Sequence, residues 1–315
     1  MNGRKMGVLV LGGAGFIGRH VVELFRSLGT KVAVLDVVPK AHYSVCDVTY
    51  YQGDFSDFKD IAECMESSGA THVVHLVSTT LPKTSNDNMI YDIQSNVMST
   101  VRLLDLCVKH RLKKIVFMSS GGTVYGNSHT LPIEEGHPTD PICSYGITKL
   151  TIEKFIQLYS REHGIDHVIL RPSNPYGPGQ NPSSGQGVIT TFLGKIANRQ
   201  PLEVWGDGST IRDYFHVSDL ANLTCQATLS DATGVFNAGS GSGTSINQLI
   251  TVIGEILGVN PEVNFLPART FDVPAIVLDR RKAHDAFGWV PKISLEGGIR
   301  RYLADPTHVA SQSQS

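Results

Sequence analysis

The sequence has few cysteines, almost no net charge and no long apolar run, and each shortage excludes a class of protein. Its five cysteines are scattered, odd in number and without the spacing of metal ligands, so we expect reduced thiols and no metal site. A net charge of −2 argues against a nucleic-acid partner or an anionic membrane surface. No stretch of about 18 apolar residues and no signal-peptide pattern occurs, so we expect a cytoplasmic protein without a transmembrane segment.

The first stretch with a clear pattern lies near the N-terminus. An apolar run over residues 8–11 ends in glycines at Gly12, Gly15 and Gly18, and apolar residues at helical spacing follow over 21–28. This pattern predicts a strand, a tight turn and a helix. Gly12 permits the turn, Gly15 lets the backbone approach a pyrophosphate, and Gly18 allows the helix to pack closely on the strand. The alternative is a purely structural turn.

Two aspartates follow at the ends of further short apolar runs. Asp36 ends the run 32–35, where a dinucleotide-binding fold places the carboxylate that holds the adenosine ribose. Asp54 ends the run 49–53 and either contacts adenine or caps a helix that starts near Phe58.

Strand and helix patterns continue to alternate through the first half of the chain. Apolar runs at 70–76 and 114–118 predict buried strands, and a helical pattern extends from about 86 to 110. The alternation predicts an α/β fold, a Rossmann-type doubly wound parallel sheet with helices on both faces. Ligands bind such sheets at the carboxyl ends of their strands, where residues 119–126 follow the second run.

The segment 144–149 carries the residues that we expect to perform chemistry. Tyr145 and Lys149 are four residues apart at the start of a predicted helix reaching about His163, so they share one helix face. A free tyrosine, with a pKa of about 10, is a weak base at neutral pH. A lysine ammonium on the same face, together with a positively charged nicotinamide, would stabilise the phenolate.

These motifs together resemble a known family. The spacing G-x-x-G-x-x-G, the Tyr-x-x-x-Lys motif, and the segments 119–126, 170–177 and 205–220 resemble the extended short-chain dehydrogenases, in particular the nucleotide-sugar epimerase/dehydratase group and, within it, the UDP-glucose 4-epimerases. The resemblance covers residue 7 to about residue 303. It implies NAD as cofactor, a UDP-sugar as substrate and a homodimer.

The resemblance also assigns binding roles. For the cofactor it implies Gly12, Gly15, Phe16, Ile17, Gly18, Asp36, Asp54, Phe55, Leu76, Ser78, Asn96, Ser119, Tyr145, Lys149 and Pro172. Asn96 is expected to brace the tyrosine region, whereas His75 is interpreted as structural. For the substrate it implies Thr123, Asn174, Ile189, Trp205, Arg212, Tyr214, Arg269, Asp272 and Ile276. Arg212 and Arg269 would grip the diphosphate bidentately; alternatively, Arg212 forms an ion pair with Asp207 or Asp213.

The sequence departs from the family at one catalytic position. Four residues before Tyr125, where the family carries Ser or Thr, this chain has Gly121. If the backbone there stays extended, Thr123 points to the same side as Gly121. We therefore expect Thr123 to supply the catalytic hydroxyl, with Ser120 as the alternative if a bulge turns it inward.

The expected activity is epimerisation at C4 of a UDP-sugar through a transient 4-keto intermediate. A dehydratase is disfavoured because its usual Asp-Glu pair is replaced by Gly122 and Thr123. A 4-keto reductase and a non-catalytic dinucleotide-sensing protein remain alternatives. We expect an NAD-binding domain over 1–173 and about 211–255, a substrate-binding lobe over about 174–210 and 256–305, and a disordered tail over 306–315.

Overall fold

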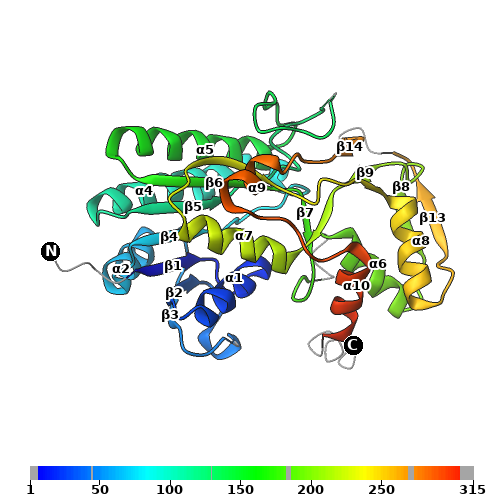
Figure 1. Cartoon of the computed structure of the whole chain (residues 1–315), viewed down its shortest axis with the longest axis horizontal. Coiled ribbons are helices and arrows are strands. Elements are labelled where there is room, and N and C mark those ends of the chain that lie inside the picture. Colours follow the sequence, from blue (N-terminus) through cyan, green and yellow to red (C-terminus); the bar gives the residue numbers. More distant parts are fainter. Residues whose placement is uncertain (1–5, 44, 129, 182–185, 269–272, 306–315) are drawn as a thin grey trace. The chain divides into compact units, whose positions relative to one another are not determined.

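The computed structural model describes residues 6–43, 45–128, 130–181, 186–268 and 273–305, and the chain forms two compact units (Figure 1). The first unit comprises Met1–Tyr125, Pro138–Arg171 and Ala221–Phe236. The second comprises Gly126–His137, Pro172–Leu220 and Asn237–Ser315. Each unit is described by itself below.

The first unit is built on a seven-stranded sheet of order β11-β6-β5-β4-β1-β2-β3. Successive pairs from β6 to β3 are parallel. This confirms the expected doubly wound α/β fold. The strands are β1 Gly7–Leu11, β2 Lys31–Asp36, β3 Thr49–Gln52, β4 His72–His75, β5 Lys114–Met118, β6 Asp166–Pro172 and β11 Gly234–Ala238. The helices are α1 Phe16–Ser27, η1 Lys40–His42, α2 Phe58–Ser68, η2 Ser85–Asp87, α3 Met89–Asp92, the π-helical η3 Ile93–Met98, α4 Ser99–Lys109, α5 Ser144–His163 and α7 Val217–Leu229.

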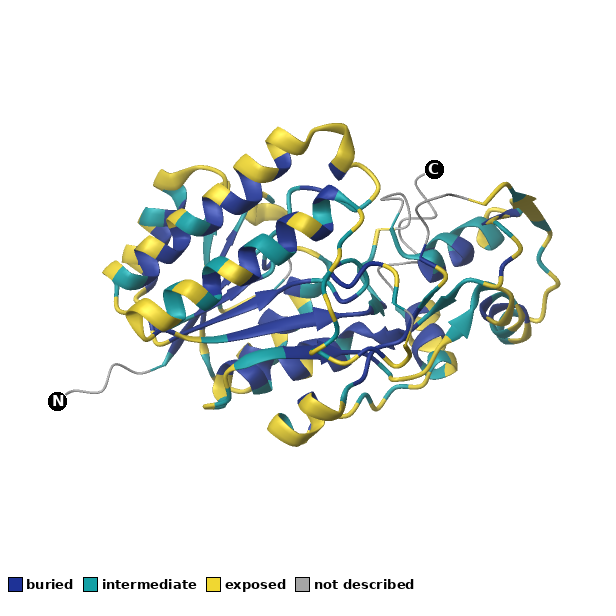
Figure 2. Ribbon diagram, turned by 90° about the horizontal axis from the view of Figure 1, so that it is seen from above, coloured by how far each residue is buried: buried dark blue, intermediate teal, exposed yellow. Residues whose placement is uncertain are grey.

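Alternation along the strands explains why helices cover both faces of this sheet. Leu9, Leu35 and Phe117 point to the face where α2, α4 and α5 complete one buried core. The next residues along the strands point to the other face, where Val34 lies against the α1 side chain Val22 near the glycine turn. Figure 2 shows the buried strands between helices with exposed outer faces.

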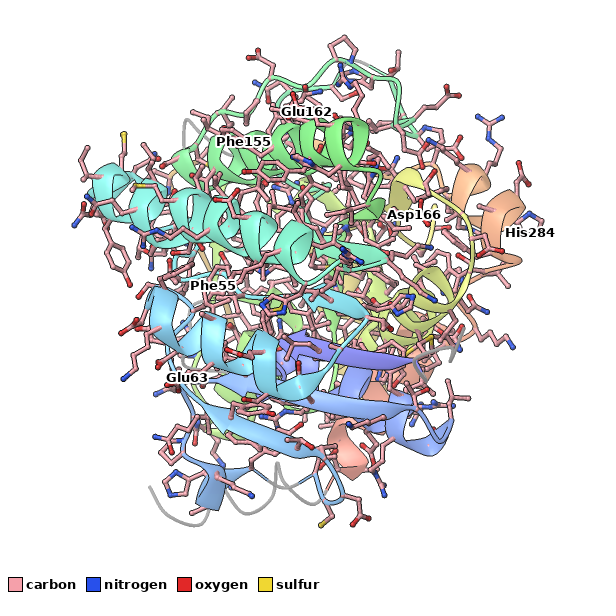
Figure 3. The ribbon with its side chains drawn as sticks, turned by 90° about the vertical axis from the view of Figure 1, so that its left-hand side faces the viewer. Phe55, Glu63, Phe155, Glu162, Asp166 and His284 are labelled. Atoms are coloured by element: carbon pink, nitrogen blue, oxygen red, sulfur yellow. The ribbon has the colours of Figure 1, made fainter. Side chains whose placement is uncertain are left out.

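Helix α5 illustrates this two-sided pattern (Figure 3). Phe155 packs against the core, whereas Glu162 near the end of the helix is exposed, as is Glu63 on α2. The sequence predicted the bounds of α5 and of β5 as the structure has them. None of the described helices combines the length and the apolar character needed to cross a membrane.

The second unit combines short sheets with helices around a separate core. That core includes side chains of α6, β8, α8 and α10, with Leu202, Phe192 and Leu249 fully or nearly fully buried. Its strands are β7 Asn174–Tyr176, β8 Leu202–Trp205, β9 Ile211–Arg212, β10 Tyr214–His216, β12 Thr244–Ser245, β13 Val263–Leu266 and β14 Ala275–Ile276. Its helices are α6 Val188–Ala197, α8 Ile246–Leu257, α9 Arg281–Phe287 and α10 Leu295–Ala304.

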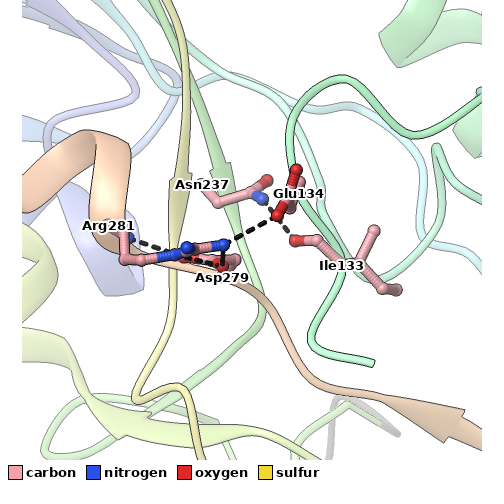
Figure 4. A network of polar contacts seen from close by, with 5 residues as sticks. All are labelled: Ile133, Glu134, Asn237, Asp279 and Arg281. Carbon is pink, nitrogen blue, oxygen red and sulfur yellow. Dashed lines mark hydrogen bonds and ion pairs between the residues drawn. The ribbon is translucent and has the colours of Figure 1, made fainter. Parts of the chain in front are cut away.

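The observed division differs from the expected boundaries in several places. Residues 126–137 and 237–255 belong to the second unit rather than to the NAD-binding unit, and the boundaries next to 172–173 and 211–220 shift in the same direction. Polar contacts explain the first difference (Figure 4): Asn237 Nδ2 donates to the Ile133 carbonyl at 2.9 Å, and Arg281 bridges Glu134 and Asp279. The Asn237–Ile133 and Arg281–Glu134 partners are 104 and 147 positions apart, so no local pattern in the sequence predicts these two contacts.

Candidate active site

The glycine turn has the geometry expected of a dinucleotide site. Gly12 has φ +81°, a conformation that a residue with a side chain rarely adopts. A Cβ on Gly18 would lie 2.1 Å from the Gly12 carbonyl oxygen, so only glycine lets α1 approach so closely. Gly15 precedes α1 and supplies no side-chain cap, which leaves the N–H groups of the first turn, at Phe16 and Ile17, available to an anion.

Asp36 lies at the end of β2 beside this turn. One carboxylate oxygen accepts the Ala14 N–H at 2.8 Å and the other accepts the Val38 N–H at 3.1 Å. Each oxygen has a further lone pair for a ribose hydroxyl. The carboxylate is therefore fixed where the sequence predicted the adenosine ribose, and the turn and Asp36 together fit NAD.

Asp54 does not cap helix α2, because Asp57 is the N-cap and accepts the Lys59 N–H at 2.8 Å. The Asp54 carboxylate instead accepts the N–H and the hydroxyl of Ser56. This removes the alternative considered from the sequence. The adjacent Phe55 is buried, and its ring contacts that of His75 at a centroid distance of 4.7 Å.

His75 has a structural environment. Its Nε2 lies 3.0 Å from the Thr100 hydroxyl, and burial followed by the nearby charge of Lys149 lowers its pKa to about 3. The imidazole is therefore neutral at physiological pH. Leu76, the next residue, donates its N–H to Leu11 and continues the sheet beyond β4.

Tyr145 and Lys149 lie in the first two turns of α5. The Lys149 Nζ donates to the Met118 carbonyl at the end of β5 (2.9 Å) and lies 5.5 Å from the centre of the Tyr145 ring. Both residues therefore lie at the carboxyl edge of the sheet. The turn that carries Thr123 contacts α5 beside Tyr145, and Gly146 permits this close contact. A Cβ on Gly146 would lie 2.8 Å from the Thr123 carbonyl oxygen.

Burial dominates the pKa shifts of Tyr145 and Lys149. Desolvation raises the pKa of Tyr145 to about 12, although a hydrogen bond with Ser78 opposes the shift. Desolvation lowers the pKa of Lys149 to about 8, and the charges of Asp92 and Glu153 limit that fall. A positive charge next to Tyr145, such as that of a nicotinamide, would favour its phenolate.

The segment after β5 corrects one expectation. The backbone there is not extended: Ser120 begins a turn in which its carbonyl accepts the N–H groups of Thr123 and Val124. The argument from alternating sides therefore fails, because a turn has no alternation. The Thr123 hydroxyl is nevertheless buried and has no hydrogen-bond partner among the described residues, which leaves it available to a substrate oxygen. Ser119 donates its hydroxyl to Glu153.

A buried ion pair holds this turn in place. Arg171 on β6 contacts Glu153 on α5 with two nitrogens, at 2.9 and 2.6 Å, and donates to the Tyr125 hydroxyl at 3.0 Å. The next residue, Pro172, ends β6. The pair thus joins α5 to β6 and to the end of the turn that carries Thr123.

Apart from Thr123, the described residues that are expected at the substrate lie in the second unit, in different surroundings. Asn174 pairs with β10 through the Asp213 carbonyl (3.0 Å), and Trp205 is 43% exposed. Tyr214 is buried, and its hydroxyl has no hydrogen-bond partner in the part of the chain that the structure describes. Ile189 and Ile276 are each 1% exposed. Arg269 and Asp272 lie outside the described residues.

The Arg212 guanidinium contacts two backbone carbonyls. Its Nη1 donates to the carbonyls of Ile211 and Val273, at 2.9 and 2.8 Å. The Asp213 carboxylate accepts donors from Ser240, Gly241 and Leu278. Ile276 pairs with Arg212 in parallel register, which brings these two candidate residues side by side.

Sequence reasoning named Asn96 but missed Asp92, to which Asn96 is hydrogen-bonded. Asn96 accepts the Thr79 N–H at 3.0 Å and donates to Asp92 at 3.0 Å, and Asp92 in turn accepts the hydroxyls of Ser144 and Thr148. Asp92 belongs to no motif. The only sequence signal was its spacing of four residues before Asn96, which places both on one helix face.

Comparison with known proteins agrees with this geometry. A family model described as the NAD dependent epimerase/dehydratase family matches residues 8–239. The chain belongs to this family. A putative UDP-glucose 4-epimerase of Methanocaldococcus jannaschii is 36% identical, over 94% of this chain and 97% of that protein.

Two further similarities bear on the chemistry. The chain is 31% identical to a dTDP-4-dehydro-6-deoxyglucose reductase of Escherichia coli, over 96% of this chain and 98% of the relative. The crystal structure of the Thermotoga maritima UDP-glucose 4-epimerase with UDP-glucose superposes with a TM-score of 0.92 at 32% identity, covering 98% of this chain and 100% of that one.

Proposed function

We propose that this protein is an NAD-dependent 4-epimerase of UDP-sugars. The observation that carries the proposal is the pairing of Tyr145 and Lys149 on one face of α5, at the carboxyl edge of a sheet whose first turn fits a dinucleotide. The similarity to UDP-glucose 4-epimerases over nearly the whole chain supports it.

The glycine turn and Asp36 would hold NAD, which accepts the hydride from the sugar C4 and returns it. Tyr145 takes the proton of the C4 hydroxyl and later gives it back to the 4-keto oxygen. Lys149 holds the nicotinamide ribose and favours the Tyr145 phenolate by its charge. The Thr123 hydroxyl, or that of Ser120, donates to the sugar O4. Asn174 and Arg212 would contact the diphosphate.

The decisive test is product analysis after separate incubation with UDP-glucose, UDP-N-acetylglucosamine and UDP-glucuronate. Replacing Tyr145 by Phe should leave folding and NAD binding intact and lower turnover at least ~10²-fold, because it removes a positioned acid–base group. A Tyr145→Phe variant with near-normal activity would show that the tyrosine does not have this role.

Two variants identify the catalytic hydroxyl. Thr123→Val should reduce turnover more than Ser120→Ala does, because the Thr123 hydroxyl is buried without a partner. A larger loss in Ser120→Ala would assign the role to Ser120.

Asp36 should also select the cofactor. A carboxylate accepts ribose hydroxyls but repels a 2′-phosphate, and no arginine occupies position 37 or 38. Dissociation constants measured by fluorescence quenching should favour NAD over NADP by a wide margin; a preference for NADP would contradict the assignment of Asp36 and point to Arg19.

The sugar preference is a narrower proposal. In the related epimerases, the residue matching Ile276 limits the space around the C2 substituent, and Gly121 and Gly122 add room. We therefore expect the N-acetylhexosamine pair to be accepted. Because Ile276 is 1% exposed, it either lines the sugar pocket or is ordinary core. Ile276→Tyr should reject the acetamido sugars at a cost of ~1–3 kcal/mol and spare UDP-glucose. An unchanged ratio of the two activities would place Ile276 in the core.

A 4-keto reductase is the second candidate, favoured by the similarity to the E. coli reductase and by the same Tyr–Lys pair. The two activities differ in stoichiometry. An epimerase needs no added NADH, whereas a reductase consumes one NADH per product. Absence of both turnovers, with NAD binding retained, would favour a dinucleotide-sensing protein.

The exposed apolar side chains of α3, η3 and α5 support a homodimer. Ile90 is 67% exposed, Ile147 54% and Ile93 46%, and α5 contacts both α3 and η3. Large exposed apolar patches commonly mark interfaces, and two copies can bury the same face against itself. Light scattering should give a dimer mass, which Ile90→Lys together with Ile147→Lys should halve. No disulfide joins the cysteines in the described part of the chain, which is compatible with a cytoplasmic location.

A further inference from the structure

Asp92 at the end of α3 is a carboxylate with no solvent exposure and an unusual set of partners. Its Oδ1 accepts the Thr80 hydroxyl at 2.7 Å and Asn96 Nδ2 at 3.0 Å. Its Oδ2 accepts the hydroxyls of Ser144 at 2.7 Å and Thr148 at 3.0 Å. All four donors are neutral, and within the described part of the chain Asp92 forms no ion pair. Burying a carboxylate without a cation costs folding free energy. The presence of Asp92 at such a place therefore points to a function.

The donors connect Asp92 to both catalytic side chains. Ser144 directly precedes Tyr145, and Thr148 directly precedes Lys149. Thr80 follows Ser78, which hydrogen-bonds to Tyr145. The preceding helix η2 contacts the same helix end, since its Ser85 hydroxyl accepts the Tyr145 N–H at 3.0 Å.

We propose that Asp92 is a positioning residue of the active site: it fixes the first two turns of α5 to the segment after β4, and its uncompensated charge sets the pH at which Tyr145 and Lys149 work. This inference rests on the proposed epimerase function. The geometry explains why the residue is an aspartate. Four donors require four acceptor sites, and an asparagine offers one acceptor oxygen with two lone pairs.

The electrostatic part follows from the charges around Lys149. On its own helix it faces Tyr145 and Glu153, on α3 it faces Asp92, and on β4 it faces the neutral His75. Glu153 is neutralised by Arg171 at 2.6 Å. Of the two carboxylates near Lys149, Glu153 has Arg171 as its cationic partner, whereas Asp92 has no such partner among the described residues. Its charge raises the pKa of Lys149 and also that of Tyr145, which otherwise faces Ser78 and Cys143.

The test uses Asp92→Asn in the full-length protein with NAD bound, with kcat and KM for UDP-glucose measured between pH 5.5 and 9.5. Turnover should fall about 10–100-fold because misplaced reacting groups lose orientation, while KM changes less than about 3-fold. Both limbs of the pH profile should move to lower pH by about half a unit or more, because removal of the negative charge lowers both pKa values. Unchanged kcat and an unmoved profile would overturn the proposal.

The matched control is Asp105→Asn. Asp105 on α4 accepts the Tyr159 hydroxyl of α5 at 2.6 Å, about 20 Å further along the helix, so this variant makes the same charge-removing exchange in a contact with α5 without changing the active site. It should keep wild-type kcat and pH profile. If Asp92→Asn does not fold, Thr148→Val removes one donor and retains the charge; it should lower kcat several-fold without moving the profile. Wild-type kcat in that variant would overturn the positioning role.

A second readout separates this inference from the proposed function. If the wild-type protein turns over no UDP-sugar, the epimerase proposal fails, but the role of Asp92 can still be tested. The ultraviolet absorbance titration of Tyr145, obtained by subtracting the matching Tyr145→Phe spectrum, should move to lower pH in Asp92→Asn and stay in place in Asp105→Asn. An unmoved titration in Asp92→Asn would refute the electrostatic role.

Discussion

Lys149 and Arg171 are two buried cations of the first unit, each 4% exposed, and they have opposite environments. Burial works against the charge of Arg171, but the hydrogen bonds and charge of Glu153 more than compensate and raise its pKa. Lys149 donates to a single carbonyl and faces two aromatic rings, and its pKa falls to about 8. Arg171 thus stays charged, whereas the pKa of Lys149 lies close to physiological pH, as perturbed pKa values at functional sites often do.

The largest expected effect is the loss of the paired cation. Arg171→Met should lower the free energy of unfolding by about 3–5 kcal/mol, because it leaves the Glu153 carboxylate buried without its partner. Urea denaturation followed by circular dichroism measures this. The double variant Arg171→Met, Glu153→Leu should recover most of the loss; a single variant as stable as wild type would contradict the structural role of the pair.

Loss of Lys149, the cation without a carboxylate partner among the described residues, should raise the free energy of unfolding rather than lower it. Lys149→Met should raise the free energy of unfolding at pH 7 by ~1–3 kcal/mol in the protein without cofactor, because it removes a buried ammonium that is poorly compensated. It should also abolish turnover. Destabilisation at pH 7 would show that Lys149 is better paired than its contacts indicate.

The pH dependence of that gain provides a sharper test. The pKa of Lys149 is about 8 in the folded chain against an ordinary 10.5, so the unfolded chain binds more protons between these values. The destabilisation by Lys149 is full below about pH 8 and disappears as the pH rises to about 10.5. The advantage of Lys149→Met over wild type should therefore shrink between pH 8 and 10, measured by urea denaturation at each pH.

The smallest expected effect concerns Ser119, which donates to Glu153 beside the paired cation. Ser119→Ala should lower the free energy of unfolding by about 1–3 kcal/mol, since the hydrogen bond is to a charged group. NAD affinity should change less than about 3-fold. A large loss of NAD affinity with unchanged stability would instead assign the Ser119 hydroxyl to the cofactor, as the family resemblance implies.

The sequence by itself determined the elements whose signals are local. The glycine turn, Asp36 at the end of β2 and the Tyr145–Lys149 spacing on α5 could all be predicted, because strand alternation, helix periodicity and turn chemistry act over a few residues. The parallel sheet followed from the alternation of these elements.

Only the tertiary structure decided what surrounds those residues. The turn at Ser120–Val124, the Arg171–Glu153 pair and the four donors of Asp92 bring together residues up to 68 positions apart, from Thr80 to Thr148. No local pattern specifies such contacts. The pKa values of Tyr145 and Lys149 likewise depend on burial and on charges supplied by other elements, so they could not be obtained from the motif that contains both residues.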